Sequence, residues 1–152
     1  MIENFAIKPD CKSIHPGFRA KSALQNNRKL EAAMRISEET LDNFTIHYPL
    51  ERLAPLERIL FVDIETTGFT ARTSYLYLIG CAYYLAGKWR TIQWMAESYE
   101  QEADVLQAFF NFSKLYRCLI HFNGNNFDLP FITQKCAQLS LPYSFDGFQG
   151  LD

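Results

Sequence analysis

The spacing of hydrophobic and polar positions changes several times along the second half of the chain. The stretch RILFVDIE at residues 58–65 contains a continuous apolar run, which predicts a strand buried on both faces. The stretch SYLYLIGCAYYLAGKWRTIQWMAE at residues 74–97 predicts two long strands joined by a tight turn at Ala86 and Gly87. We therefore expect a central strand followed by a hairpin.

After the hairpin the apolar spacing becomes helical. Residues 100–117 have acids in their opening turn and one apolar face, which predicts an amphipathic helix. The stretch RCLIHF at residues 117–122 predicts a second short buried strand, and NGNN at residues 123–126 predicts a turn. Residues 128–140 then predict a helix, with Pro130 in its first turn, where a missing N–H costs little.

The order of these elements predicts an α/β fold with a mixed sheet. Two strands separated by a helix of this length are most simply parallel neighbours. The hairpin should lie antiparallel beside the first strand, because its strands are joined by a tight turn. We therefore expect a sheet of an antiparallel hairpin plus parallel strands, flanked by helices.

Residues 1–57 differ from the rest and are expected to form a helical or irregular N-terminal extension to a domain at residues 58–152. Between residues 8 and 35 there are seven Lys and Arg against Asp10 and Glu31. This excess of positive charge is consistent with a nucleic-acid contact, although charge runs more often form a solvated helix face. Within the extension, SEETLDNF at residues 37–44 has the N-cap serine and early acids of a short helix.

Composition supports one compact domain. The chain has 152 residues, of which 48% are hydrophobic, enough for a core. Its net charge of −2 gives no global basic field, so a nucleic-acid partner would have to be held locally. The four widely spaced cysteines indicate free thiols. With no leader-like start and no apolar stretch of about 20 residues, we expect a cytoplasmic protein without membrane contact.

Asp63 and Glu65 are the first candidates for chemistry. Residues two apart on a strand point to the same side, so both carboxylates should lie on one face while Ile64 faces the other. Like charges held close together at the end of a buried strand are unfavourable without a cation. Hard divalent cations prefer such oxygen ligands, so the pair indicates a metal site.

Asp128 is the third candidate. It follows the second predicted buried strand, and parallel neighbours would bring it to the same edge of the sheet as Asp63 and Glu65. Three converging carboxylates suit two Mg²⁺ or Mn²⁺ ions roughly 4 Å apart, as used in metal-assisted hydrolysis of phosphodiesters.

The segments FVDIETTG and FNGNNFDLPF resemble the first and second motifs of the DnaQ-like DEDD 3′-to-5′ exonucleases of the ribonuclease H-like superfamily. The second segment most resembles the YprB family and is also similar to the proofreading domain of family B DNA polymerases. FTIHYPLERL before the first motif and YLYLIG after it also fit the YprB pattern. The resemblance extends from about Phe44 to the end of the chain and implies a ribonuclease H-like fold.

Position by position, the resemblance implies roles for the residues of these two segments. The implied metal ligands are Asp63, Glu65 and Asp128. The residues implied to form the turn beside the terminal nucleotide are Thr66, Thr67 and Gly68, and those implied to shape the floor of the site are Asn123 and Phe127.

The chain departs from the family pattern at its C-terminal end. The family supplies a fourth Asp, with a Tyr or His four or five residues before it, and no such motif follows Asp128. YSFD at residues 143–146 has a different spacing, and Asp152 fits the start of the next strand. We therefore expect a C-terminally truncated domain without its last strand and helix, and with a weakened second metal site. The exposed edge left by the missing strand should make the chain marginally stable or prone to associate.

Several of these residues also have simpler interpretations. Asp128 could serve only as a helix N-cap, and Asn123 and Asn125 could be turn formers beside a Gly124 selected for positive φ. His121 is more readily a packed core residue than a catalytic base. The aromatic residues of the hairpin could stack on bases, although alternating aromatics on strands usually form the core and cross-strand pairs.

Two functions are consistent with the sequence. The first is a metal-dependent 3′-to-5′ exonuclease-like domain that hydrolyses terminal phosphodiesters of single-stranded DNA or RNA. The alternative is a catalytically incomplete chain that only binds nucleic acid or a protein partner. The choice between DNA and RNA, the polarity, the pathway and the oligomeric state are left open by the sequence.

Overall fold

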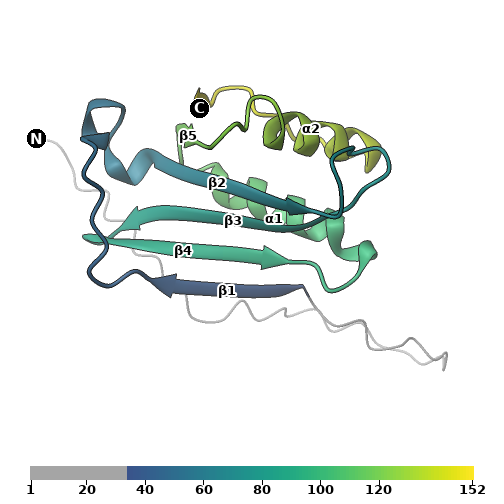
Figure 1. Cartoon of the computed structure of the whole chain (residues 1–152), viewed down its shortest axis with the longest axis horizontal. Coiled ribbons are helices and arrows are strands. Elements are labelled where there is room, and N and C mark those ends of the chain that lie inside the picture. The colour runs from purple at the N-terminus through teal and green to yellow at the C-terminus, as the bar shows by residue number, and fades with distance from the viewer. Residues whose placement is uncertain (1–33) are drawn as a thin grey trace, which may run out of the picture. The chain divides into compact units, whose positions relative to one another are not determined.

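The computed structural model describes residues 34–152, which form a fold built around a single mixed sheet (Figure 1). The sheet has the strand order β1-β4-β3-β2-β5-β6. Its strands are β1 (Arg35–Thr40), β2 (Ile59–Thr66), β3 (Leu76–Leu85), β4 (Lys88–Met95), β5 (Cys118–Ile120) and β6 (Gln149–Leu151). The helices are α1 (Glu102–Ser113) and α2 (Asp128–Gln138), with short 3₁₀ turns at Leu50–Arg52, Leu56–Arg58 and Tyr99–Gln101.

β2 lies at the centre of the sheet and determines where the candidate residues lie. It pairs antiparallel with β3 and parallel with β5, so both predicted pairings are confirmed. β3 and β4 form the predicted hairpin, and both turn residues have positive φ, 52° at Ala86 and 82° at Gly87. The register between β2 and β3 shifts between Glu65 and Thr66, directly after the two acids.

The two faces of β2 have different environments. Leu60, Val62 and Ile64 point into the main core, where they pack with residues of α1 and α2 such as Phe109 and Ile132. The opposite face is covered only in part. Residues between Leu41 and Leu56 pack there with Ile59, Trp89 and Cys118 in a second, smaller cluster. Beyond that cluster the face is open, and the acids of β2 lie on this open half.

The helix predicted at residues 37–44 is wrong, because β1 occupies Arg35–Thr40 and pairs antiparallel with β4. Glu38 accepts a hydrogen bond from the Tyr83 hydroxyl and pairs with Arg90, so this acid has partners on other strands of the sheet. The open edge of β4 supplies the partner, which outweighs the local helix signal. The basic segment before Arg35 lies almost entirely outside the described residues, as does the rest of residues 1–33.

The C-terminal residues add a short strand where the sequence led us to expect none. Residues 149–151 form β6, which pairs in parallel with β5. Edges of the sheet are therefore formed by β1 and by the three residues of β6, and association through them stays a prediction. Cys81, Cys118 and Cys136 are buried free thiols, as predicted for the cysteines that the structure describes. No helix in residues 34–152 is long and apolar enough to cross a membrane.

Candidate active site

Asp63 and Glu65 lie on the same open face of β2, as the alternation of the strand requires. Both are exposed, whereas Ile64 between them is buried in the core. Both line a groove of about 570 Å³. The rest of the groove lining is Phe61, Val62, Leu78, Gly80, Cys81, Ala82, Thr91, Gln93, Ile120, His121 and Phe122. The floor is thus largely apolar, with the two carboxylates among the few charged groups.

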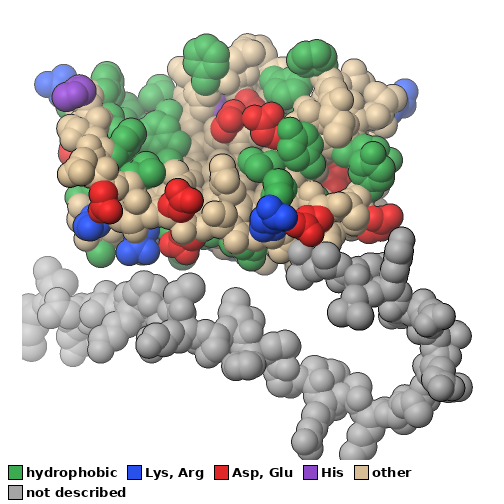
Figure 2. Space-filling view, turned by 60° about the horizontal axis from the view of Figure 1, so that its bottom comes forward, with side chains coloured by type: hydrophobic (Ala, Val, Ile, Leu, Met, Phe, Trp, Pro, Cys, Tyr) green, Lys and Arg blue, Asp and Glu red, His purple; other side chains and the backbone are tan. Residues whose placement is uncertain are grey.

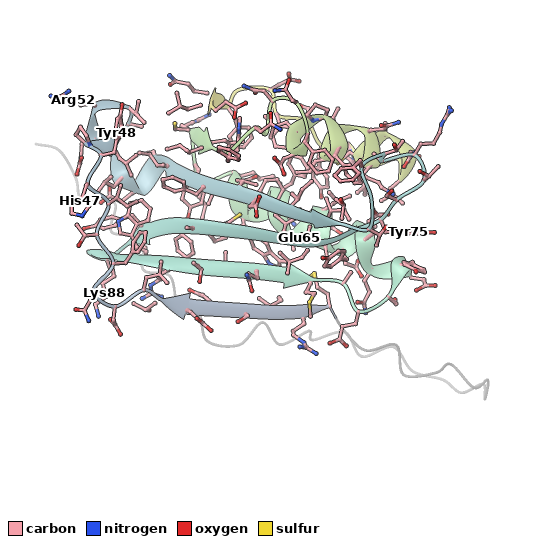
Figure 3. All side chains as sticks on the ribbon, in the orientation of Figure 1. His47, Tyr48, Arg52, Glu65, Tyr75 and Lys88 are labelled. Carbon is pink, nitrogen blue, oxygen red and sulfur yellow. The ribbon has the colours of Figure 1, made fainter. Side chains whose placement is uncertain are left out.

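Glu65 lies near the C-terminal end of β2, in the half of the sheet that faces Tyr75 in Figure 3. The labelled residues His47, Arg52 and Lys88 lie at the other end of the sheet. Acidic side chains form several groups on the face shown in Figure 2. The groove itself has no Lys or Arg among its lining residues. A polyanion would therefore meet like charge at the acids unless a cation intervened.

Asp128 is the first residue of α2 and is 5% exposed. Burial raises the pKa of its carboxyl, and the charge of Asp63 raises that pKa further. Backbone hydrogen bonds at Asp128 itself and at Ile64, together with the charge of His121, act in the opposite direction. The carboxylates of Asp63 and Asp128, 65 residues apart in sequence, therefore lie close enough to repel each other. The N-cap of α2 is Phe127 and makes no side-chain cap, so Asp128 does not have the simple N-cap role.

The three acids are not brought together equally. The charge of Asp63 acts on Asp128, and Asp63 shares the groove with Glu65, whereas Asp128 does not line that groove. Within residues 34–152, no group of three or more His, Cys, Asp and Glu side chains is placed to hold a metal ion. The donor chemistry of the Asp63 and Asp128 pair nevertheless fits one Mg²⁺ or Mn²⁺, because such ions are commonly held by one or two carboxylates together with water and substrate phosphate.

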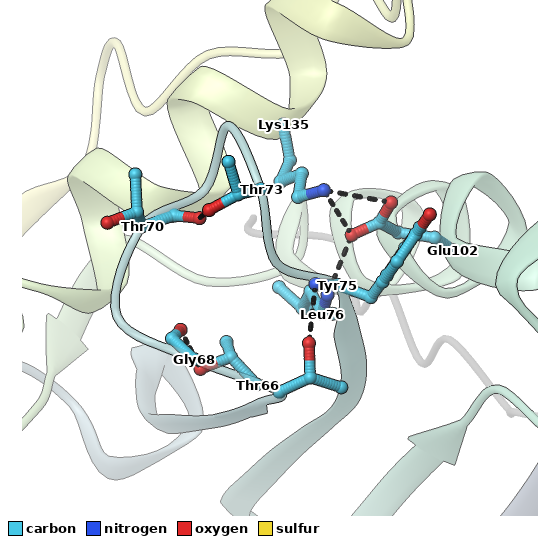
Figure 4. A network of polar contacts seen from close by, with 9 residues as sticks. Thr66, Gly68, Thr70, Thr73, Tyr75, Leu76, Glu102 and Lys135 are labelled. Carbon is cyan, nitrogen blue, oxygen red and sulfur yellow. Dashed lines mark hydrogen bonds and ion pairs between the residues drawn. The ribbon is translucent and has the colours of Figure 1, made fainter.

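The loop after β2 is held by its own backbone and hydroxyl groups (Figure 4). Thr67 N–H donates to the Tyr75 carbonyl, and Tyr75 N–H donates to Thr67 Oγ1, both at 2.9 Å. The Thr66 hydroxyl donates to the Gly68 carbonyl. A Cβ at Gly68 would lie 2.6 Å from Ser74 Oγ, so close approach across the loop requires glycine there. The three residues proposed to form the turn therefore lie at the end of β2, just after the acids.

The turn between β5 and α2 is closed by Asn123. Its φ is 55°, its carbonyl accepts the N–H groups of Asn126 and Phe127, and its side chain accepts a hydrogen bond from that of Asn126. Gly124 is not among the residues with positive φ, so that expectation is wrong. A Cβ at Gly124 would lie 2.5 Å from the His121 ring, and this close approach is the physical reason for glycine.

The burial of His121 was predicted from the sequence, but the contacts of its ring nitrogens were not. Its side chain is entirely buried, in agreement with a packed residue, yet neither ring nitrogen has a hydrogen-bond partner. Nδ1 lies 3.6 Å from Oδ1 of Asp152, while Oδ2 of Asp152 accepts the Asn125 N–H. β6 and the turn at residues 123–126 are thus connected through Asp152, a contact between segments far apart in sequence that no local pattern could have predicted.

Aromatic side chains divide into packed and exposed groups. Trp89 and Trp94 of the hairpin are buried, which agrees with the core interpretation rather than base stacking. Phe69 and Phe122 are instead 92% and 93% exposed, and Phe122 lines the groove. Phe127 is partly buried and packs edge-on against Phe69. The exposed rings were missed, because a phenylalanine beside a turn gives no signal of its exposure.

The geometry can be compared with known proteins. The family model described as the RNase_H superfamily matches residues 60–152. The structure is similar to that of a family B DNA polymerase from the hyperthermophilic archaeon Pyrobaculum calidifontis, with a TM-score of 0.53 and 17% identity. That similarity covers 64% of this chain and 15% of the polymerase chain, and it concerns the fold alone. Comparison with curated proteins gives no match.

Proposed function

This chain belongs to the RNase H superfamily, and from that membership we propose that it is a metal-dependent nuclease domain of the 3′-to-5′ exonuclease type, acting on single-stranded DNA or RNA. The observation that carries the proposal is the juxtaposition of Asp63 and Asp128 beside an open groove. These carboxylates come from two different elements, and the pKa of Asp128 is raised first by burial and then by the charge of Asp63. Two carboxylates this close together are tolerated most readily where a bound cation offsets their repulsion.

Each residue of the proposed site has a distinct task. Asp63 and Asp128 would hold a divalent ion, and Glu65 would add a carboxylate from the groove side. The chemistry that a bound Mg²⁺ or Mn²⁺ supplies is activation of the attacking water and stabilisation of charge on the phosphodiester. Thr66, Thr67 and Gly68 would contact the terminal nucleotide, and Asn123 and Phe127 would form the floor below it.

A second function is favoured by a different observation. Residues 34–152 contain no group of three or more His, Cys, Asp and Glu side chains placed to hold a metal ion. Metal-assisted hydrolysis with two ions needs more ligands than one carboxylate pair offers. The second candidate is therefore a binding domain for single-stranded nucleic acid or for a protein partner, with a weakened second ion site.

Cleavage of a labelled oligonucleotide tests the first function. We expect the purified chain to shorten a 5′-labelled single strand slowly in the presence of Mn²⁺ and to lose this activity in the Asp63→Ala variant. Asp42→Ala is the matched control, because Asp42 is an exposed acid at the other end of the sheet, paired with Lys88. If the wild type and Asp63→Ala are equally inactive, the nuclease proposal is refuted, and the binding domain remains as the candidate function.

Polarity is tested with the same assay. A 3′-to-5′ exonuclease should give a ladder of products that shorten from the 3′ end, and a phosphorothioate at the 3′-terminal linkage should slow it. A ladder that persists unchanged with the blocked 3′ end would contradict the proposed polarity without affecting the assignment as a nuclease.

A further inference from the structure

A buried ion pair joins α1 and α2 behind the loop that follows β2. Lys135 Nζ lies 3.0 Å from Glu102 Oε1, and the two side chains are only 6% and 5% exposed. The other Lys and Arg ion pairs among residues 34–152 lie at the surface, with about a third or more of each side chain exposed. Burial of two charges is costly unless their geometry is good and their remaining polar atoms are satisfied.

The same carboxylate also holds the backbone of β3. The Leu76 N–H donates to Glu102 Oε1 at 2.7 Å, and Lys135 Nζ also lies 3.2 Å from Oε2 (Figure 4). The Lys135 ammonium lies 5.1 Å from the centre of the Tyr75 ring, which stacks on Tyr99. One ion pair thus connects the start of β3, the start of α1 and the last turn of α2.

Leu76 and Lys135, which both bind the Glu102 carboxylate, each lie on an element that carries part of the candidate site. Leu76 pairs with Thr66 at the end of β2, next to the register shift that follows Glu65. Lys135 lies seven residues after Asp128 on α2, which is close to two full turns, and both residues are buried on the same helix face. A displaced Lys135 would therefore rotate or shift the helix that carries Asp128, while a displaced Glu102 would release the loop.

We propose that Glu102 and Lys135 are positioning residues, which set the placement of the loop at residues 67–75 and of Asp128 relative to Asp63. The part of this inference that concerns catalysis rests on the proposed nuclease function. An apolar contact could fill the same space, but it would not hold the Leu76 N–H and the α2 helix at fixed distances from one carboxylate.

Neutralising the pair separates positioning from stability. In Glu102→Gln/Lys135→Met neither charge of the pair remains, and the glutamine oxygen can still accept the Leu76 N–H. Replacing a buried ion pair by neutral groups of similar size is often tolerated by the fold. We expect a melting temperature close to that of the wild type, faster hydrogen exchange at the Thr67 and Tyr75 amides, and a kcat lowered by about 10- to 100-fold with KM changed little.

The control is the double variant Asp42→Asn/Lys88→Met, which removes an exposed ion pair of similar length, 3.1 Å, far from the loop. It should leave exchange and kcat unchanged. A neutral Glu102/Lys135 variant with wild-type exchange and wild-type kcat would overturn the inference. A neutral variant that does not fold would assign the pair to stability alone and would overturn it as well.

The two proposals fail in distinguishable ways. If the wild type shows no cleavage with Mn²⁺, the proposed function fails. Hydrogen exchange at Thr67 and Tyr75 then still decides whether the ion pair positions the loop, because that measurement needs neither metal nor substrate. If the wild type cleaves and the neutral variant has wild-type exchange and wild-type kcat, only the positioning role fails.

Discussion

At the scale of single residues, the most informative feature is the repulsion between Asp63 and Asp128. Because burial and the neighbouring charge raise the pKa of Asp128 in the folded state, the folded protein binds this proton more tightly than the unfolded chain does. The free energy of unfolding then falls as pH rises from the unfolded pKa, near 3.8, through the folded one. Above the folded-state pKa the full destabilisation is present in the metal-free protein.

Asp63→Asn should therefore stabilise the metal-free protein at neutral pH. The substitution removes the like charge beside Asp128, and we expect a gain of roughly 0.5–1 kcal/mol in the free energy of unfolding. The gain should disappear near pH 3, because the Asp128 carboxyl, whose pKa is raised, is then largely protonated and no longer repels Asp63. Urea unfolding in EDTA at both pH values measures it. A loss of stability at pH 7 would show that the two carboxylates do not repel each other.

Single residues were also where the sequence was most and least informative. The alternation of a strand was enough to place Asp63 and Glu65 on one face, because that geometry is local. The unpaired nitrogens of His121 and the buried Glu102–Lys135 pair could not be predicted, because each depends on which distant segments pack together. An isolated Lys in an amphipathic helix is most simply expected to face solvent.

At the scale of elements, the junction between β5 and α2 depends on close packing of the turn against the strand. Gly124 lies over the His121 ring so closely that a Cβ would lie 2.5 Å from Cγ. Gly124→Ala should therefore destabilise the protein by about 1–3 kcal/mol, because the buried ring or the turn must move. Thermal or urea unfolding provides the measurement.

Gly80→Ala is the control for this prediction. A Cβ at Gly80, in the middle of β3, would meet atoms no nearer than 3.8 Å, which is ordinary contact. It should change stability by less than about 0.5 kcal/mol. If Gly124→Ala were as stable as Gly80→Ala, the tight packing of the turn on His121 would be refuted.

Elements with strong periodicity were predicted well, and those decided by a distant partner were not. β2, the hairpin, α1, β5 and α2 follow from local apolar spacing, and the parallel pairing of β2 with β5 followed from the helix between them. β1 was expected as a helix, because its caps and acids favour one locally. The open edge of β4 determined its conformation, and nothing within residues 35–40 reveals that edge.

At the scale of the whole molecule, Asp63 and Glu65 lie in one groove, on a face of the sheet that other residues cover only in part. The smaller cluster around Trp89 closes one end, and the groove occupies the other. The superfamily and the shared face of Asp63 and Glu65 could be predicted from the sequence. The relative closeness of the three carboxylates could not, since that depends on how α2 lies against β2. Of the other two carboxylates, Asp63 is the one whose charge raises the pKa of Asp128.

A calorimetric titration of Mn²⁺ into the wild type, Asp63→Asn and Asp42→Asn most directly tests whether Asp63 and Asp128 share a divalent ion. We predict one saturable site with at most a much weaker second one in the wild type. The site should be lost in Asp63→Asn and retained in Asp42→Asn. Unchanged Mn²⁺ binding in Asp63→Asn, or no saturable binding in the wild type, would contradict the shared ion site.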